Sequence, residues 1–166
     1  MGTKHRVEMQ RVEQVNGTDI VDILDLRVKK YNRTVAVIDG NFRVVKDLGN
    51  SYEFRVTVAH SSLGNNQFNE YPMKIPQAKA CDVLNGTYRE YQQYWANDTS
   101  LPIVTEAGLC PFPKGDYWIR NWLPSSEWIP SVVPDGYWRL SLDILNGDGM
   151  IECQVRYFVR LTRNFM

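Results

Sequence analysis

The residues of this chain that could do chemistry are three cysteines, two histidines and four Asn-x-Thr triplets. Catalysis has little support, because the sequence contains neither a Gly-x-Ser-x-Gly nucleophile motif nor a His-Glu-x-x-His metal motif. His60 precedes two serines where a strand is expected to end, and a turn explains that placement. No glycine-rich phosphate loop follows a strand and opens a helix. We therefore predict a protein that is not an enzyme, with no catalytic residue, metal or cofactor.

The cysteines leave several arrangements open. Cys81, Cys110 and Cys153 are too few for a disulfide scaffold, so one bridge and one odd thiol are expected in an oxidising compartment. The alternative is three buried free thiols in a cytosolic protein. A zinc site is less favoured, because there is no Cys-x-x-Cys and both His5 and His60 are far from every cysteine in sequence.

The Asn-x-Thr triplets favour secretion, since each fits the acceptor rule for N-glycosylation and a chain of this length would carry about one or two by chance. No signal peptide opens the chain, and we expect Met1–Lys4 to stand where a leader was removed. The predicted glycosylation sites are Asn16, Asn32, Asn85 and Asn97.

Length and charge limit the partners. A chain of 166 residues is long enough for one domain with a sizeable core, and we predict a single domain over residues 1–166. The formal net charge is zero, which gives no support for binding to nucleic acid or to an anionic membrane surface. No apolar run approaches the roughly 18 residues that a membrane span needs, so no transmembrane segment is expected.

The elements that must position any site are mostly strands. Apolar and polar residues alternate at 24–28, 52–58, 138–144 and 151–161, and more weakly before Asn16, which predicts half-buried strands. Val35 and Val37 lead into Asp39-Gly40, which predicts a hairpin, and Asn146–Gly149 predicts a second turn. Strands at this spacing predict an antiparallel β-sandwich.

One segment has helical spacing instead. We predict a helix from about Gln77 to Ala96, with Pro76 just before its start. This helix either packs on the sandwich or covers an opening between the sheets. Its apolar stripe consists of Ala80, Leu84, Tyr88, Tyr91 and Trp95.

The aromatic strand at 117–122 is apolar on both faces. Trp118 and Trp122 are expected on one face, and Tyr117 and Ile119 on the other. A strand of this kind needs a second cover, which could be the helix, a partner or a ligand.

The residues from Cys110 onward resemble the pattern of a known protein family. The run Cys110-Pro111, Lys114-Gly115, Tyr117, Asn121 and Leu123-Pro124 resembles the ML-type lipid-recognition superfamily. The later run 134–139 and the helix start at 81–84 are similar to an insect subgroup of that superfamily, the small secreted ganglioside-activator-like proteins, which include CheB-like chemosensory ones.

The resemblance implies an immunoglobulin-like sandwich whose sheets separate around an apolar cavity, with the helix over an opening. It also implies a disulfide between Cys81 and Cys110. The C-terminal cysteine of that superfamily usually bonds to one near the N-terminus, but no cysteine precedes Cys81, so Cys153 is expected to be unpaired or paired between chains. Trp128 corresponds to the aromatic residue at the cavity rim.

The function we expect is that of a secreted binding protein for a lipid or another long apolar ligand, such as a pheromone-type hydrocarbon. Two alternatives remain: an interaction protein or accessory factor for a membrane receptor or channel, with a closed core, and a cofactor-like activator of a glycolipid hydrolase. Phe54, Val56, Trp138 and Leu140 are expected to face the cavity, because their strands are polar on the other side. The full set of predicted ligand-binding residues is Phe54, Val56, Tyr88, Tyr91, Trp95, Ile119, Trp122, Trp128, Trp138 and Leu140.

Overall fold

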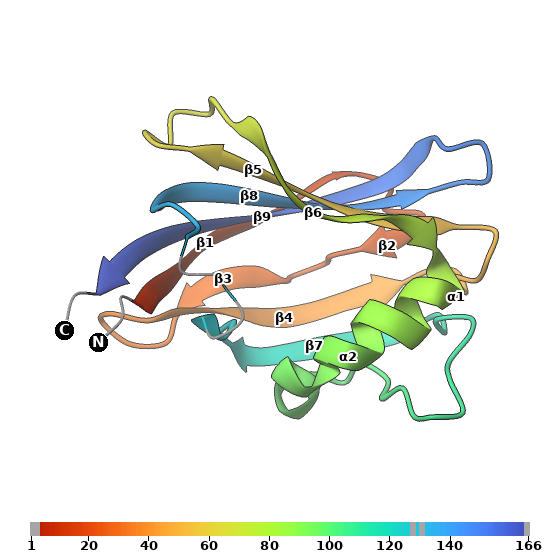
Figure 1. Cartoon of the computed structure of the whole chain (residues 1–166). Helices are drawn as coiled ribbons and strands as arrows, with labels where there is room; N and C mark the ends of the chain where they lie inside the picture. The colour runs from red at the N-terminus through yellow and green to blue at the C-terminus, as the bar shows by residue number, and fades with distance from the viewer. Residues whose placement is uncertain (1–3, 127–128, 130–131, 165–166) are drawn as a thin grey trace.

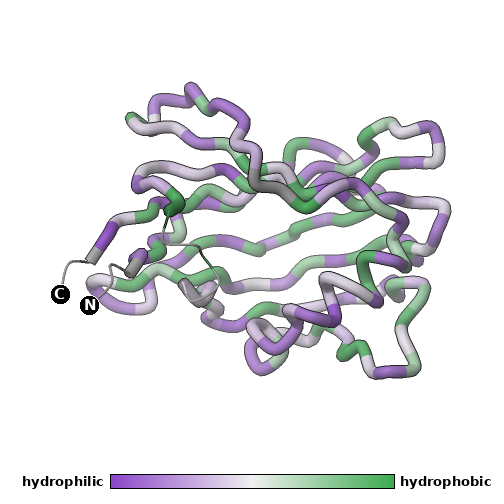
Figure 2. The backbone as a smooth tube through the Cα atoms, viewed as in Figure 1, coloured by the Kyte–Doolittle hydropathy of each residue, from purple (hydrophilic) through white to green (hydrophobic). Residues whose placement is uncertain are grey.

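The computed structural model of the chain describes residues 4–126, 129 and 132–164, and its strands form two antiparallel sheets that face each other (Figure 1). Apolar and polar residues alternate along many of the strands (Figure 2), so that one face of each sheet can turn toward the other sheet. The all-β sandwich predicted from this alternation is confirmed.

The larger sheet has the strand order β1-β9-β8-β5-β6. The alternating segments at 52–58, 138–144 and 151–161 all lie in it, and the weak alternation before Asn16 also forms a strand. The predicted turn at Asn146–Gly149 joins β8 to β9, with the Asn146 N–H donating to the Met150 carbonyl at 2.9 Å. The bounds are β1 (Lys4–Asn16), β5 (Glu53–Ser61), β6 (Asn69–Lys79), β8 (Gly136–Leu145) and β9 (Ile151–Asn164).

The smaller sheet is built around β4 (Ala36–Val44). One edge of β4 pairs with β3 (Arg27–Lys30) and then with β2 (Val21–Asp22). The other edge pairs with β7 (Gly115–Trp122), the aromatic strand. Because β7 and β6 each end a sheet, the chain between them has to pass from one sheet to the other.

The hairpin predicted at Asp39-Gly40 is wrong, because β4 continues through both residues. Gly40 has a φ of 135°, and a β-carbon on it would lie 2.6 Å from the Asp25 carbonyl oxygen, so glycine allows a close chain approach here. The Asp39 carboxylate accepts the Asn121 N–H at 3.0 Å instead of stabilising a turn. The chain turns earlier, at residues 31–35.

The strand predicted at 24–28 also begins later than expected. Leu24 has a φ of 48° and is 46% exposed, and its N–H is bonded to the Asp22 carboxylate at 3.0 Å, which makes it part of a turn. Leu26 does point inward and is buried. The alternation therefore marks only the part of this segment that pairs with β4.

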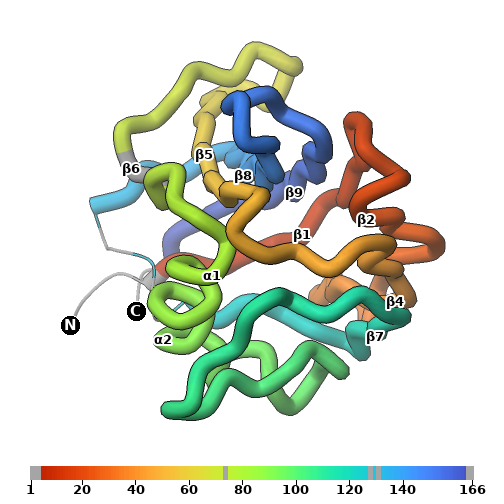
Figure 3. Tube along the Cα trace, turned by 90° about the vertical axis from the view of Figure 1, so that its right-hand side faces the viewer, coloured from red at the N-terminus to blue at the C-terminus, as the bar shows by residue number. Residues whose placement is uncertain are grey.

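The helical segment crosses from the larger sheet to the smaller one and lies beside both (Figure 3). The prediction of its start at Gln77 is wrong by three residues, because β6 continues to Lys79 and stays paired with β5. Gln77 donates its side-chain amide to Glu53 on β5. The segment consists of α1 (Ala80–Val83), the π-helical turn η1 (Leu84–Tyr88), α2 (Arg89–Tyr91) and the 3₁₀ turns η2 (Gln92–Tyr94) and η3 (Ala96–Asp98).

A disulfide joins Cys81, in the first turn of this segment, to Cys110, which precedes β7. Cys153 on β9 is a buried free thiol. The pairing implied by the resemblance is confirmed, and Cys153 is unpaired within the chain. Among the helices of the described part, none is long and apolar enough to cross a membrane.

Candidate functional site

The inward face of the larger sheet holds several of the predicted ligand-binding residues. Residues directly opposite each other in an antiparallel pair share a face of the sheet. On β5 and β8 the opposite pairs are Phe54 with Ile144, Val56 with Leu142, Val58 with Leu140, and His60 with Trp138. The register therefore brings Phe54, Val56, Trp138 and Leu140 onto one face.

Between the sheets, the described side chains form three apolar clusters. The first contains Ile20, Val44, Leu48, Leu84, Phe112, Ile144, Cys153 and Val155, with Phe54 packed against it. The second contains Met9, Leu26, Ile38 and Ile119, with Trp122 packed against it. The third contains Val58, Val133, Trp138 and Leu161, with Leu140 packed against it. The predicted residues are thus spread over all three clusters.

The middle of the inward face lies between the clusters. Val56 and Leu142 are opposite each other there, and neither packs into a cluster of described residues. Both side chains keep accessible surface, and so do their neighbours Leu140 and Tyr157. Close packing would bury such side chains fully at the centre of a sandwich. We call these four residues the mid-sheet region and treat it as the candidate site.

Tyr157 is a polar group in this apolar region, and sequence reasoning missed it. It lies opposite Leu140 and contacts the first and second clusters. Burial, with a further contribution from Cys153, raises the pKa of Tyr157 to about 12, so its hydroxyl stays neutral. That hydroxyl makes no hydrogen bond to a described residue, and it keeps accessible surface. The sequence carried one sign of its position: Tyr157 is two residues after Val155 on the same strand, so alternation places both side chains on the inward face.

The helical segment places two of its predicted residues against the core. Leu84 is 1% exposed and belongs to the first cluster. Tyr88 contacts the Phe112 ring edge-on, and its hydroxyl donates to the Pro102 carbonyl at 2.8 Å. Burial raises the pKa of Tyr88 to about 12. Both side chains therefore pack in or against the first cluster.

Tyr91 does not face inward, contrary to the prediction. It is 38% exposed and stacks on Tyr94 at 6.2 Å between ring centres. The predicted stripe assumes 3.6 residues per turn, whereas the π-helical turn at 84–88 is wider and rotates the residues after it about the helix axis. Gln92 takes the inner position, and its side-chain amide both donates to the Val104 carbonyl and accepts the Val104 N–H, each at 2.8 Å.

Trp95 remains beside Tyr88, with 5.2 Å between ring centres. Its indole N–H is buried and has no acceptor with hydrogen-bond geometry among the described residues. The same N–H is near enough to the Tyr88 oxygen to oppose part of the pKa rise there. Trp95 is therefore a buried polar group without a hydrogen-bond partner in the described part of the chain.

Trp122 lies on the face of Ile119 and not on that of Trp118, so the predicted face sharing is wrong. The β4–β7 register skips a residue between the Gly40–Ile119 and Ile38–Trp122 pairs, and Asn121 has a φ of 48°. This bulge turns Trp122 inward, where its indole N–H donates to the Tyr94 carbonyl at 2.8 Å. The prediction for Trp128 lies outside the described residues.

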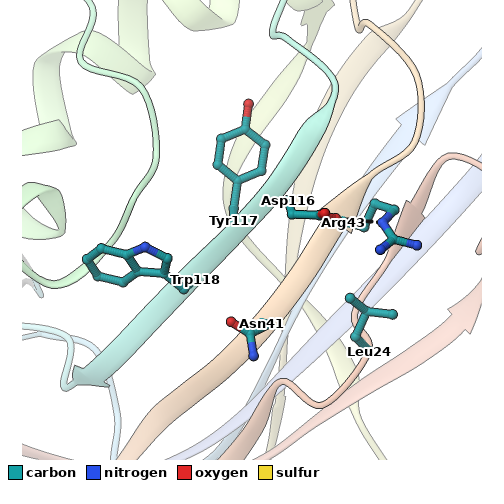
Figure 4. Close-up of a pocket in the computed structure, with 6 residues that line it drawn as sticks. All are labelled: Leu24, Asn41, Arg43, Asp116, Tyr117 and Trp118. Atoms are coloured by element: carbon teal, nitrogen blue, oxygen red, sulfur yellow. Dashed lines mark hydrogen bonds and ion pairs between the residues drawn. The ribbon is translucent and has the colours of Figure 1, made fainter.

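The outer side of the smaller sheet carries an open hollow of about 280 Å³ (Figure 4). Its lining includes an exposed ion pair between Arg43 and Asp116, whose nearest atoms are 2.6 Å apart, and Trp118, which is 37% exposed. Leu24, Asn41 and Tyr117 complete the lining. The hollow is shallow and partly polar, so it is a poor match for a long apolar ligand.

The groups that could do other chemistry have structural roles. His60 contacts the Asp135 carbonyl at 2.9 Å through Nε2, and its ring lies 4.5 Å from that of Trp138. Within residues 4–126, 129 and 132–164, no group of three or more metal-ligating side chains comes together. The described site is thus apolar, with Tyr157 as its polar group.

Comparison with known proteins gives a family of unknown function. A family model described as "Protein of unknown function (DUF1091)" matches residues 54–140, slightly more than half of the chain. The match includes β5, β6, the helical segment, the disulfide and β7. No curated protein matches the chain.

Proposed function

The chain belongs to the DUF1091 family of proteins of unknown function, and from this premise we propose that it is a secreted, non-enzymatic protein that binds a lipid or another long apolar ligand between its sheets. The observation that carries the proposal is the mid-sheet region, where Val56 and Leu142 join no cluster of described residues and all four side chains keep accessible surface. The resemblance of the Cys110–Pro124 segment to ML-type lipid-recognition proteins supports the same function.

Burial of a hydrocarbon chain would supply enough free energy. A chain of about 16 methylenes contributes roughly 13 kcal/mol at about 0.8 kcal/mol each. Loss of motion on association costs on the order of 4–15 kcal/mol. Micromolar or tighter binding therefore needs few polar contacts.

The polar end of the ligand is expected to meet Tyr157. Its hydroxyl is neutral at physiological pH because burial raises its pKa to about 12. A neutral phenol can donate to an ester, aldehyde or ketone oxygen and can accept from an alcohol. Such a contact would provide the hydrogen bond that the described residues do not, and it favours a ligand with one small uncharged polar group.

Delipidated protein tests the proposal directly, by titration with a fluorescent fatty alcohol or sterol probe. We expect saturable binding, weakened several-fold in Tyr157→Phe with little loss of stability. Native mass spectrometry of protein purified from eukaryotic cells should also show a co-purified ligand. Absence of probe binding by the delipidated protein would refute the proposal and favour the interaction protein.

A variant with a larger side chain distinguishes a hollow between the sheets from a closed core. In the proposed structure, Leu142→Trp occupies the mid-sheet region, so it abolishes probe binding and leaves the melting temperature nearly unchanged. In a closed core the same change overpacks the interior and costs about 1–3 kcal/mol. Ile144→Trp is the matched control, because Ile144 is on the same face of the same strand but only 4% exposed, and it should destabilise in either case.

A further inference from the structure

The outer face of the larger sheet carries two neighbouring arginines. Arg139 on β8 is opposite Phe158, and Arg156 on β9 is opposite Ser141, so the two arginines are diagonal neighbours on one face. Ser141, which lies beside both, is 4% exposed. This face points away from the mid-sheet region.

Neither guanidinium makes a hydrogen bond or an ion pair within the described part of the chain. The Nε atoms of Arg139 and Arg156 are both buried and make no hydrogen bond. No ion pair between described residues includes either arginine. Buried donors in proteins are nearly always bonded, and an exception calls for an explanation such as a missing ion.

A third arginine on the same face shows what a satisfied arrangement looks like. Arg55 donates from Nε and from one terminal nitrogen to the buried Asp143 carboxylate, at 3.0 and 2.8 Å. Gln154 donates to the other oxygen of that carboxylate at 2.8 Å. Within the described residues, the sheet thus gives one arginine a full set of hydrogen bonds and gives Arg139 and Arg156 none.

An aromatic ring lies against one of the two arginines. The Arg139 guanidinium carbon lies 5.1 Å from the centre of the Phe68 ring, and Phe68 meets Phe158 edge-on at 5.8 Å. Burial, and then the charge of Arg156, lower the pKa of Arg139, while the carboxylates of Glu13 and Glu70 act in the opposite direction. Glu13 lies nearer to Arg11, with 4.0 Å between Oε2 and Nε. Glu13, which lies opposite Arg156 in the β1–β9 pair, and Glu70 therefore offset part of the repulsion between the two arginines.

We propose that Arg139 and Arg156 form a binding site for a phosphate or sulfate group on the outer face of the larger sheet. Guanidinium groups present parallel N–H donors that match the oxygens of such anions, and a doubly charged anion would relieve the repulsion between them. Ser141 lies opposite Arg156 and two residues from Arg139 on the same face, and its hydroxyl is a neutral donor beside the site. The anion is either free or carried as an ester on a small molecule.

NMR of the full-length protein tests this site through the arginine Nε–H signals. Titration with inorganic phosphate, and separately with sulfate, should shift the signals of Arg139 and Arg156 saturably, and chloride at the same ionic strength should not. Glycerol phosphate distinguishes the sources: tighter binding than inorganic phosphate assigns an ester, and equal binding assigns the free ion. Signals that stay unchanged, or that respond equally to chloride, would show that Glu13 and Glu70 neutralise the arginines and would overturn the proposal.

Variants provide the second measurement. Arg139→Gln and Arg156→Gln should each weaken phosphate binding by about tenfold or more, because each removes a charged hydrogen-bonding group. Arg43→Gln is the matched control, since Arg43 is on the outer face of the other sheet and is paired with Asp116. Lipid-probe binding should be the same in all three variants, so this proposal can fail while the proposed function stands. If Arg43→Gln weakened phosphate binding as much as the other two variants, the anion would be responding only to the overall charge of the protein, and the proposal would be overturned.

Discussion

At the scale of single residues, Asn85 differs from the other predicted glycosylation sites. Its amide nitrogen donates to the Cys81 carbonyl at 3.0 Å, and its oxygen accepts the Leu109 N–H at 2.7 Å. It therefore connects the helix start to the loop at the other end of the disulfide. The side chains of Asn16 and Asn97 are exposed and donate no hydrogen bond to described residues.

Replacing this asparagine should cost stability even without a glycan. We expect Asn85→Ala, made in bacteria, to lower the free energy of unfolding by about 1–3 kcal/mol, because two backbone groups lose their partner. Asn97→Ala removes a sequon of the same type and should change stability by less than about 0.5 kcal/mol. Equal urea midpoints for the two variants would contradict the bridging role of Asn85.

Cys153 should make stability depend on alkaline pH. Burial raises the pKa of this thiol from 9.0 to about 11. Between these values the unfolded chain releases the proton and the folded chain keeps it, so stability is full below pH 9 and falls as the pH rises toward 11. Urea midpoints measured from pH 8 upward should show this fall, and it should be smaller in Cys153→Ala. The unmodified protein and Cys153→Ala should be compared below pH 10, the ordinary pKa of a tyrosine. Above that pH, Tyr88 and Tyr157 would also lower the stability as the pH rises.

At the scale of elements, the helical segment shows what a residue pattern can and cannot predict. Its apolar stripe located a helix in an otherwise β chain, because i, i+4 spacing has no counterpart in strands. The helix was predicted to start three residues too early, because the pairing of β6 with β5 outweighs local helix propensity at 77–79. The direction of Tyr91 was misplaced because a π-helical turn leaves no mark on apolar periodicity.

The two tyrosines of the stripe give a matched pair of variants. Tyr88→Ala should destabilise by about 3 kcal/mol, since it removes a ring packed on the first cluster and a hydrogen bond to the Pro102 carbonyl. Tyr91→Ala should cost less than about 1 kcal/mol, because its ring contacts mainly Tyr94 at the surface. Thermal melts compare them, and a larger loss for Tyr91→Ala would mean that the helix faces the other way.

Strand prediction succeeded and failed for related reasons. Residues 52–58 and 138–144 alternate cleanly because one face of the larger sheet is apolar and the other polar, and both were placed correctly. Asp39-Gly40 has the composition of a hairpin turn, but glycine is also needed where chains approach closely, and the sequence does not distinguish these uses. The bulge that turns Trp122 depends on the β4 register and is not encoded in the local alternation.

The candidate site was only partly predictable. Phe54, Val56, Trp138 and Leu140 were placed on the correct face, because inward direction follows from alternation. Phe54 packs on the first cluster, Trp138 lies in the third with Leu140 packed against it, and Val56 lies in none. This division depends on the opposite sheet, and no local pattern reports it. Tyr157 was left out because a tyrosine within an inward apolar set resembles any other core residue until its missing hydrogen bond is seen.

At the scale of the whole molecule, the disulfide connects the two sheets. It joins the helix start after β6 to the segment before β7, at a sequence separation of 29. Cross-linking residues this far apart restricts the unfolded chain and is worth about 3–4 kcal/mol. The double variant Cys81→Ser with Cys110→Ser should lose that amount in urea unfolding, and reduced unmodified protein should match it. A double variant as stable as the oxidised protein would show that helix packing alone holds the sheets together here.

The pairing of β1 with β9 has a consequence for how the chain acquires its structure. These strands place Lys4 opposite Asn164, so the first and last segments of the chain are neighbours in the larger sheet. A chain emerging from the ribosome has no partner for β1 until β9 has been synthesised, and closing so long a loop makes folding slow. Until then the apolar inner face of β1 is exposed to other chains. Formation of the complete larger sheet is therefore expected to follow synthesis of β9, and a truncation that removes β9 should aggregate instead of forming a smaller sandwich.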